Sequence, residues 1–117
     1  MRIAVASDGL DVSKHGSRCA SYTCYTVDRG IITACQNTPN PCLALPLNAN
    51  YLQRLGVDVY IARKVEPQLR ELLEDLGIDV VEGARGSTRD AAEAYLARLF
   101  SGSDLSADED ELDVPTA

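Results

Sequence analysis

Four cysteines and one histidine are the side chains in this sequence best suited to bind a soft metal ion. Thiolates and imidazoles are preferred ligands of iron, copper and zinc. The intervals between Cys19, Cys24, Cys35 and Cys42 contain four, ten and six residues. These spacings match no zinc-finger or ferredoxin pattern. The spacing alone therefore defines no metal site, and the expected fold must indicate which thiols come together.

A predicted β-hairpin brings two of the cysteines close. Segments 21–27 and 31–35 are rich in strand-forming residues and flank a short turn that contains Gly30. If this turn has two residues, Cys24 directly faces Cys35, with a Cα separation of about 4.5–5.5 Å. The pair could then ligate one metal or cluster, form a disulfide, or be buried as two small apolar side chains. All three alternatives remain open from the sequence.

Charged side chains near the ends of the expected strands are candidates for binding an anion or a metal. Arg18, Arg63 and Lys64 could flank a negative ligand, or could be ordinary solvated charges, the interpretation that we favour for Lys64. Asp8 follows the first apolar run, where a two-metal nuclease would hold a metal-binding carboxylate. We expect Asp8 instead to cap the loop that begins at Gly9.

The hydrophobic pattern predicts one α/β domain. Apolar runs indicate strands at 2–6, 21–27, 31–35, 57–62 and 78–81, and helical periodicity indicates helices at 46–55, 67–76 and 88–100. Two prolines predict an irregular segment at 38–42. Leu47 is expected to face inward from the first helix, and Ser87 with Asp90 to cap the last. The expected architecture is a mixed sheet of about five strands, with an early antiparallel hairpin, late parallel strands and helices on both faces.

The net charge of −7 is concentrated at the C-terminal end. Residues 101–117 contain six acids and no base, whereas residues 1–100 carry 12 acids and 11 bases. Low hydrophobicity and high charge predict a disordered acidic tail at 101–117 after a folded domain at 1–100. A domain without a basic excess is not expected to bind nucleic acid. No run approaches the ~20 apolar residues of a membrane span, so we expect no membrane association and a cytoplasmic location.

Strings distributed over residues 1–100 follow the pattern of a known family. They include MRIAVASDG at 1–9, VSKH at 12–15, the segment 37–41 and the long stretch 56–99. Their order resembles the dinitrogenase iron–molybdenum cofactor biosynthesis family, the small NifX/NafY-like domains. The resemblance implies a ribonuclease-H-like fold for residues 1–100.

The resemblance also implies a non-enzymatic accessory role as a carrier of an iron–sulfur or molybdenum–iron–sulfur cluster. It implies that His15 is a cluster ligand, and Arg18 and Arg63 are then candidates for binding the same anionic cofactor. Together with the thiols, the candidate metal ligands are His15, Cys19, Cys24 and Cys35. The expected partners are the proteins that donate and accept the cluster, and the chain itself is expected to be a monomer or a weak dimer.

Two loop positions differ from the family pattern. Gly16-Ser17 follows His15, where the family usually has Phe-Gly, and Arg63-Lys64 stands where relatives have Gly-Gly. A second hypothesis therefore keeps the fold without the cluster. In that hypothesis the chain is a regulatory or protein-interaction module, and the acidic tail is its partner-binding arm.

Overall fold

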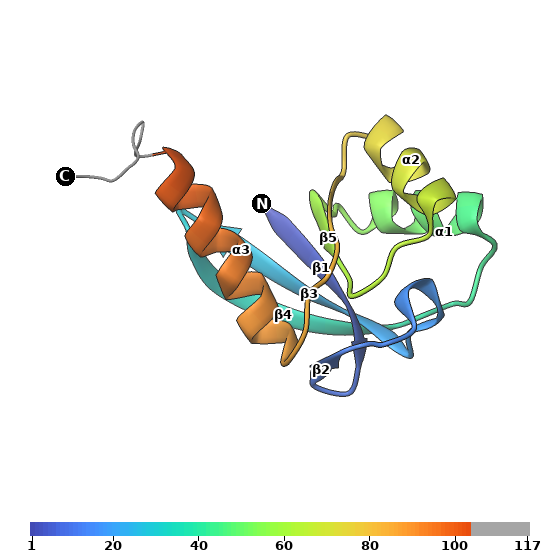
Figure 1. The fold of residues 1–117 in the computed structure, drawn as a ribbon, viewed down its shortest axis with the longest axis horizontal. Helices are drawn as coiled ribbons and strands as arrows, with labels where there is room; N and C mark the ends of the chain where they lie inside the picture. Colours follow the sequence, from blue (N-terminus) through green and yellow to red (C-terminus); the bar gives the residue numbers. More distant parts are fainter. Residues whose placement is uncertain (104–117) are drawn as a thin grey trace.

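A mixed β-sheet forms the central layer of residues 1–103, which are the residues that the computed structural model describes. Its six strands are β1 (Arg2–Asp8), β2 (Asp11–Val12), β3 (Ser21–Asp28), β4 (Ile31–Pro39), β5 (Val59–Ile61) and β6 (Asp79–Val81). The order across the sheet is β4-β3-β1-β5-β6, and the short β2 pairs with the end of β1. Strands β1, β5 and β6 are parallel, whereas β3 and β4 form an antiparallel hairpin beside β1 (Figure 1).

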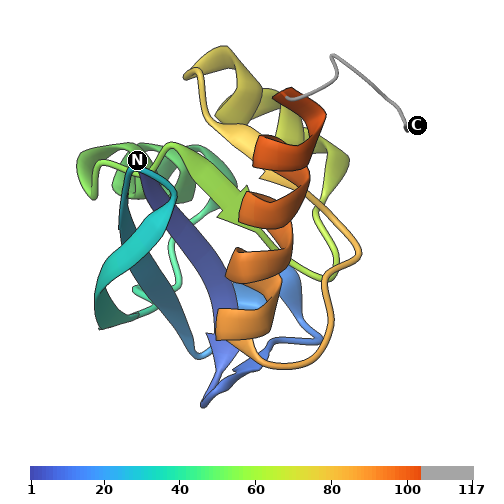
Figure 2. The same cartoon turned by 90° about the vertical axis from the view of Figure 1, so that its left-hand side faces the viewer.

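Helices cover both faces of this sheet. The helices are α1 (Leu45–Arg54), α2 (Pro67–Asp75) and α3 (Thr88–Ser103), and a 3₁₀ turn, η1, spans Gly16–Arg18. α1 and α2 lie against one face and α3 crosses the other (Figure 2). Along β1, Ala4 and Ala6 belong to the first core layer, and Ile3 and Val5 to the second. Because β1 is buried on both faces, it forms the centre of the core.

The predicted α/β architecture is confirmed, with an N-terminal hairpin, parallel strands and helices on both faces. The predicted cap of α3 is present, since the amide of Asp90 donates to Ser87 Oγ at 3.0 Å. α3 continues to Ser103, three residues past the expected domain boundary. The rest of the predicted acidic tail, residues 104–117, lies outside the described residues. No helix within residues 1–103 is long and apolar enough to cross a bilayer.

Two local predictions are wrong. The segment expected to be irregular begins inside β4, which continues through Thr38 and Pro39. A proline is tolerated there because β4 is an edge strand and Pro39 is its last residue, so the missing amide breaks no interior ladder. Leu47 was expected to face inward, yet it is 56% exposed, and Asn48 and Ala49 are buried instead.

The predicted pairing of Cys24 with Cys35 is also wrong. The hairpin starts in the expected register, but a β-bulge shifts it between Thr26 and Val27. Thr33 is the extra residue of β4 at this bulge, so Cys24 pairs with Gln36 and Cys35 pairs with Tyr25. Facing residues share a side of the sheet, and a shift of one residue moves a side chain to the other side. Cys24 and Cys35 therefore lie on opposite faces.

Candidate functional site

Three loops meet where the parallel strands end. Loop 9–20 follows β1, loop 62–66 follows β5 and loop 82–87 follows β6. Because these strands are parallel neighbours, their carboxyl ends lie at one edge of the sheet. Open α/β sheets bind their ligands at this edge. The three loops are therefore the first place to look for a site.

Backbone hydrogen bonds join the three loops. The amide of Gly83 donates to the carbonyl of Arg63 at 3.0 Å, and the amide of Val12 donates to the carbonyl of Gly86 at 2.9 Å. These bonds connect the loop after β6 to the loops after β5 and β1. Main-chain bonds therefore hold the three loops together.

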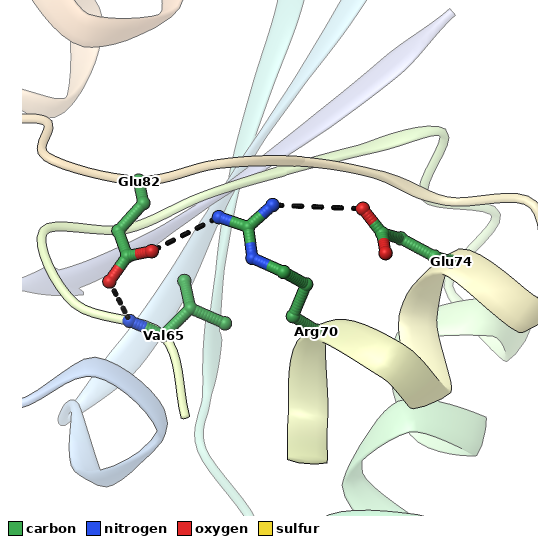
Figure 3. A network of polar contacts seen from close by, with 4 residues as sticks. All are labelled: Val65, Arg70, Glu74 and Glu82. Carbon is green, nitrogen blue, oxygen red and sulfur yellow. Dashed lines mark hydrogen bonds and ion pairs between the residues drawn. The ribbon is translucent and has the colours of Figure 1, made fainter. Parts of the chain in front are cut away.

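Glu82 strengthens the same connection through its carboxylate (Figure 3). It accepts a hydrogen bond from the amide of Val65 at 3.2 Å and pairs with Arg70 at 3.0 Å. Arg70 also lies 3.6 Å from Glu74. The amide of Val65, and then Arg70, hold the pKa of Glu82 below its ordinary value of 4.5. Glu82 is therefore ionised at neutral pH, and Arg70 compensates its charge.

Asp8 organises the loop that carries His15. Its carboxylate accepts the amide of Ala20 at 2.9 Å and the hydroxyl of Ser13 at 2.8 Å. The oxygen of Ser13 in turn accepts the amide of His15 at 3.0 Å. The bond from Ala20, followed by that from Ser13, lowers the pKa of Asp8. Asp8 thus caps the loop, as predicted.

Gly16 brings the His15 loop into contact with the loop after β5. Its φ is +57°, and a β-carbon at this position would overlap the carbonyl oxygen of Lys64. The hydroxyl of Ser17 donates to Glu66 at 2.6 Å. Gly16-Ser17 therefore packs against the loop that contains Arg63-Lys64, through one close approach of two backbones.

Two adjoining hollows open on this edge. The larger has a volume of about 500 Å³, and its charged and ionisable lining residues are Lys14, His15, Arg18, Lys64, Glu66 and Glu82. The smaller has a volume of about 360 Å³ and is lined by Lys14, Arg63, Lys64, Gly83 and Arg85. They share Lys14 and Lys64. We call the residues Lys14, His15, Arg18, Arg63, Lys64 and Arg85 the basic edge.

The basic edge concentrates positive charge in an acidic chain. Five of the 11 bases of the chain belong to it. Within residues 1–103, ion pairs involve Arg70 and Arg89 but none of these five. The carboxylates that line the larger hollow are those of Glu66 and Glu82, and Glu82 is already paired. Concave surfaces with one sign of charge attract ligands of the opposite sign.

The structure brings the three predicted cofactor-binding residues to this one edge. His15 and Arg18 line the larger hollow, and Arg63 lines the smaller. The side chain of His15 is the one imidazole among these cations. This arrangement can attract an anion by charge and bind it through one imidazole.

The predicted cysteine ligands lie elsewhere. Cys19 is 2% exposed beneath the His15 loop, and burial raises the pKa of its thiol to about 11. Cys24 is buried in the core under α1 and α2, and burial raises its pKa as well. Cys35 is exposed on β4. Within residues 1–103 no three His, Cys, Asp or Glu side chains are grouped so that they could hold a metal ion.

Sequence reasoning missed part of the basic edge. For Lys64 the sequence favours ordinary surface charge over anion binding, and for segment 83–87, which contains Arg85, it favours a plain turn and helix cap. It gives no separate signal at Lys14. Each follows a strand of the parallel set or lies in the loop after it. The available signal was this common position, because the carboxyl ends of parallel neighbours converge.

A family model described as "Dinitrogenase iron-molybdenum cofactor" matches residues 1–98. Among solved structures, PH0822 superposes with a TM-score of 0.76 at 22% identity, covering 83% of this chain and 91% of that one. MJ0327 from Methanocaldococcus jannaschii superposes with a TM-score of 0.66 at 14% identity, covering 87% and 89%. These two show the fold alone.

The apo form of the orange protein from Desulfovibrio gigas is also similar. It has a TM-score of 0.64 and 26% identity, with 86% of this chain and 88% of that chain covered. A search of curated proteins gives no match. The family match spans all three loops of the basic edge.

Proposed function

The chain belongs to the dinitrogenase iron–molybdenum cofactor family, which takes part in the biosynthesis of that cofactor, and we propose that it carries an anionic metal–sulfur cluster. The observation that supports this proposal is the basic edge, in which His15 and three cations line a hollow of about 500 Å³ and two further cations line the adjoining hollow. The cluster is cargo that the chain receives and passes on. We propose no catalytic step.

The donor set of the basic edge suits a preassembled cluster better than a bare metal ion. A bare ion needs three or four protein ligands, and residues 1–103 contain no such group. A cluster that brings its own sulfide ligands needs few protein donors and carries negative charge. Cations then supply most of the binding energy, and one imidazole supplies a soft ligand.

Within this proposal each residue has a separate role. His15 ligates the cluster through a ring nitrogen, because its backbone is fixed by Ser13 and Asp8 while its side chain lines the hollow. Arg18 neutralises cluster charge within the same hollow, and Arg63 does so from the adjoining hollow. Attachment through one histidine also allows release, because only one metal–protein bond must break for transfer.

Anaerobic reconstitution tests the proposal. The protein is incubated with iron, sulfide and molybdate, desalted, and examined for charge-transfer absorption and for bound metal. Wild type is expected to become coloured, and His15→Ala is expected to lose at least half of that colour. The double variant Arg18→Gln with Arg63→Gln is expected to bind the cluster more weakly and with greater salt sensitivity.

The matched control replaces two exposed arginines outside the basic edge, Arg54→Gln with Arg98→Gln, and is expected to bind as wild type does. Equal colour in wild type and His15→Ala would remove His15 from the site. If the Arg18/Arg63 variant and the Arg54/Arg98 control bind the cluster equally well, the basic edge does not bind it.

A second candidate function keeps the same fold without the cluster. The observation that favours it is the packing of Gly16 against Lys64, at two positions where the resemblance leads us to expect other residues. As a regulatory or interaction module, the chain would take up no metal under the same conditions. The reconstitution experiment therefore separates the two functions directly.

A further inference from the structure

The smaller hollow of the basic edge has an unbalanced charge. Its lining contains four cations, Lys14, Arg63, Lys64 and Arg85, together with Gly83, and no carboxylate. Lys14, Lys64 and Arg85 are exposed, and Arg63 is half-buried. None of the four forms an ion pair within residues 1–103. Cations held this close repel one another, and an anionic group among them would relieve that repulsion.

The chain itself contains a segment that carries only negative charge. Residues 104–117 carry no base, and their six acids are Asp104, Asp108, Glu109, Asp110, Glu111 and Asp113. Five of these acids fall within the six residues 108–113. This segment therefore matches the hollow in sign and in multiplicity of charge.

The segment is long enough to reach the hollow. It begins after Ser103, at the end of α3, and α3 starts three residues after Arg85. A helix of 16 residues is about 24 Å long, so Ser103 is separated from the Arg85 end by roughly that distance. Asp113 is ten residues beyond Ser103, and ten extended residues span up to about 33 Å. The acids at 110–113 can therefore return along α3 to the hollow.

We propose that residues 110–113 dock in the smaller hollow of the basic edge of the same chain. Their carboxylates pair with Arg63, Arg85 and the two lysines that the hollows share. Because Lys14 and Lys64 also line the larger hollow, the docked segment competes with any anion bound beside His15. This regulatory consequence rests on the proposed function, whereas the docking itself does not.

Covalent attachment makes weak docking effective. A tethered segment experiences an effective concentration in the millimolar range when its linker spans the distance. Each carboxylate–cation contact at a solvated surface is screened by salt, with a Debye length of about 8 Å at physiological ionic strength. Docking should therefore be strong at low salt and lost at high salt.

The test compares backbone amide NMR spectra of metal-free full-length protein and of the chain that ends at Ser103, at about 20 mM and about 500 mM salt. At low salt the two spectra are expected to differ at residues 14–18, 63–66 and 83–86, and at high salt these differences should vanish. A full-length variant with all six tail acids changed to Asn or Gln should match the truncated chain. The double variant Lys14→Glu with Lys64→Glu should lose the differences as well.

Several outcomes would overturn the proposal. Spectra that differ only next to Ser103 would show that the segment does not dock. Differences that grow with protein concentration would place the segment on a second copy instead. Differences that survive in the Asn/Gln variant would exclude charge as the cause. Because the test uses metal-free protein, docking without cluster uptake would contradict the proposed function alone, and cluster uptake without docking would contradict this inference alone.

Discussion

Gly16 and Asp8 shape the basic edge although neither residue lines its hollows. Gly16 lets two backbones approach where a β-carbon would overlap the Lys64 carbonyl. Asp8 closes the same loop by accepting hydrogen bonds from Ala20 and Ser13. The position of His15 therefore depends on two residues that need not touch a ligand. Each can be tested by stability measurements alone.

Gly16→Ala should destabilise the chain more than Gly9→Ala does. Both glycines have a left-handed φ, +57° and +66°, but a β-carbon at Gly9 would meet nothing within 4 Å. The conformational cost alone predicts a loss of about 1–2 kcal/mol for Gly9→Ala. Gly16→Ala adds the overlap with Lys64, so its free energy of unfolding in urea should be lower still. Equal losses in the two variants would mean that the loops do not touch.

The contribution of Asp8 to stability should disappear in acid. Its folded pKa lies below the ordinary value of 3.8, so its stabilising effect is full above that value and is lost as the pH falls through the folded pKa. The measurement is the difference in free energy of unfolding between wild type and Asp8→Asn. This difference should be constant above about pH 5 and shrink below pH 3.8. A difference that stays constant down to pH 2.5 would contradict the hydrogen bonds assigned to the carboxylate.

Strand β4 is the element whose local structure departs most from the sequence prediction. The short turn and the alternating pattern correctly predict the hairpin and its first pairs. One additional residue, Thr33, then shifts every later pair. A bulge leaves little signal in an alternating run, because threonine and alanine are acceptable on either face of an edge strand.

The cysteines fall into two classes by burial. Cys35 and Cys42 are exposed, whereas Cys19 and Cys24 are buried, and a thiol with a pKa of about 11 such as Cys19 is almost wholly protonated at neutral pH. Iodoacetamide should therefore modify two cysteines in the native protein and four in urea, as counted by mass spectrometry. Mild oxidation should produce no Cys24–Cys35 disulfide. Rapid native labelling of Cys24 would contradict the register.

Part of the basic edge follows from the sequence alone. Hydrophobic periodicity predicts the parallel strands and therefore the edge at which their loops meet. It also places His15, Arg18 and Arg63 in those loops. Lys14 and Lys64 look like ordinary surface charges in the sequence, and only the packing of Gly16 on the second loop brings them to a shared boundary between two hollows.

Across the whole molecule, positive and negative charges are concentrated in different places. Residues 1–100 are nearly neutral, and residues 101–117 carry six acids without a base. Five of the 11 bases of the folded part gather on one edge. An acidic chain thus presents a cationic surface along this edge, and the contrast in charge is greatest between that edge and the C-terminal segment.

Metal and sulfide analysis of protein purified without oxygen tests the central claim most directly. Wild type should contain iron and acid-labile sulfide, with or without molybdenum. The double variant Lys14→Glu with Lys64→Glu reverses the charge of the two residues that both hollows share. It should lose most of the bound iron and sulfide. Arg54→Glu with Arg98→Glu makes the same change of net charge at exposed positions elsewhere and should retain the wild-type content. Absence of metal and sulfide from wild type, or equal contents in all three proteins, would contradict a cluster carried on the basic edge.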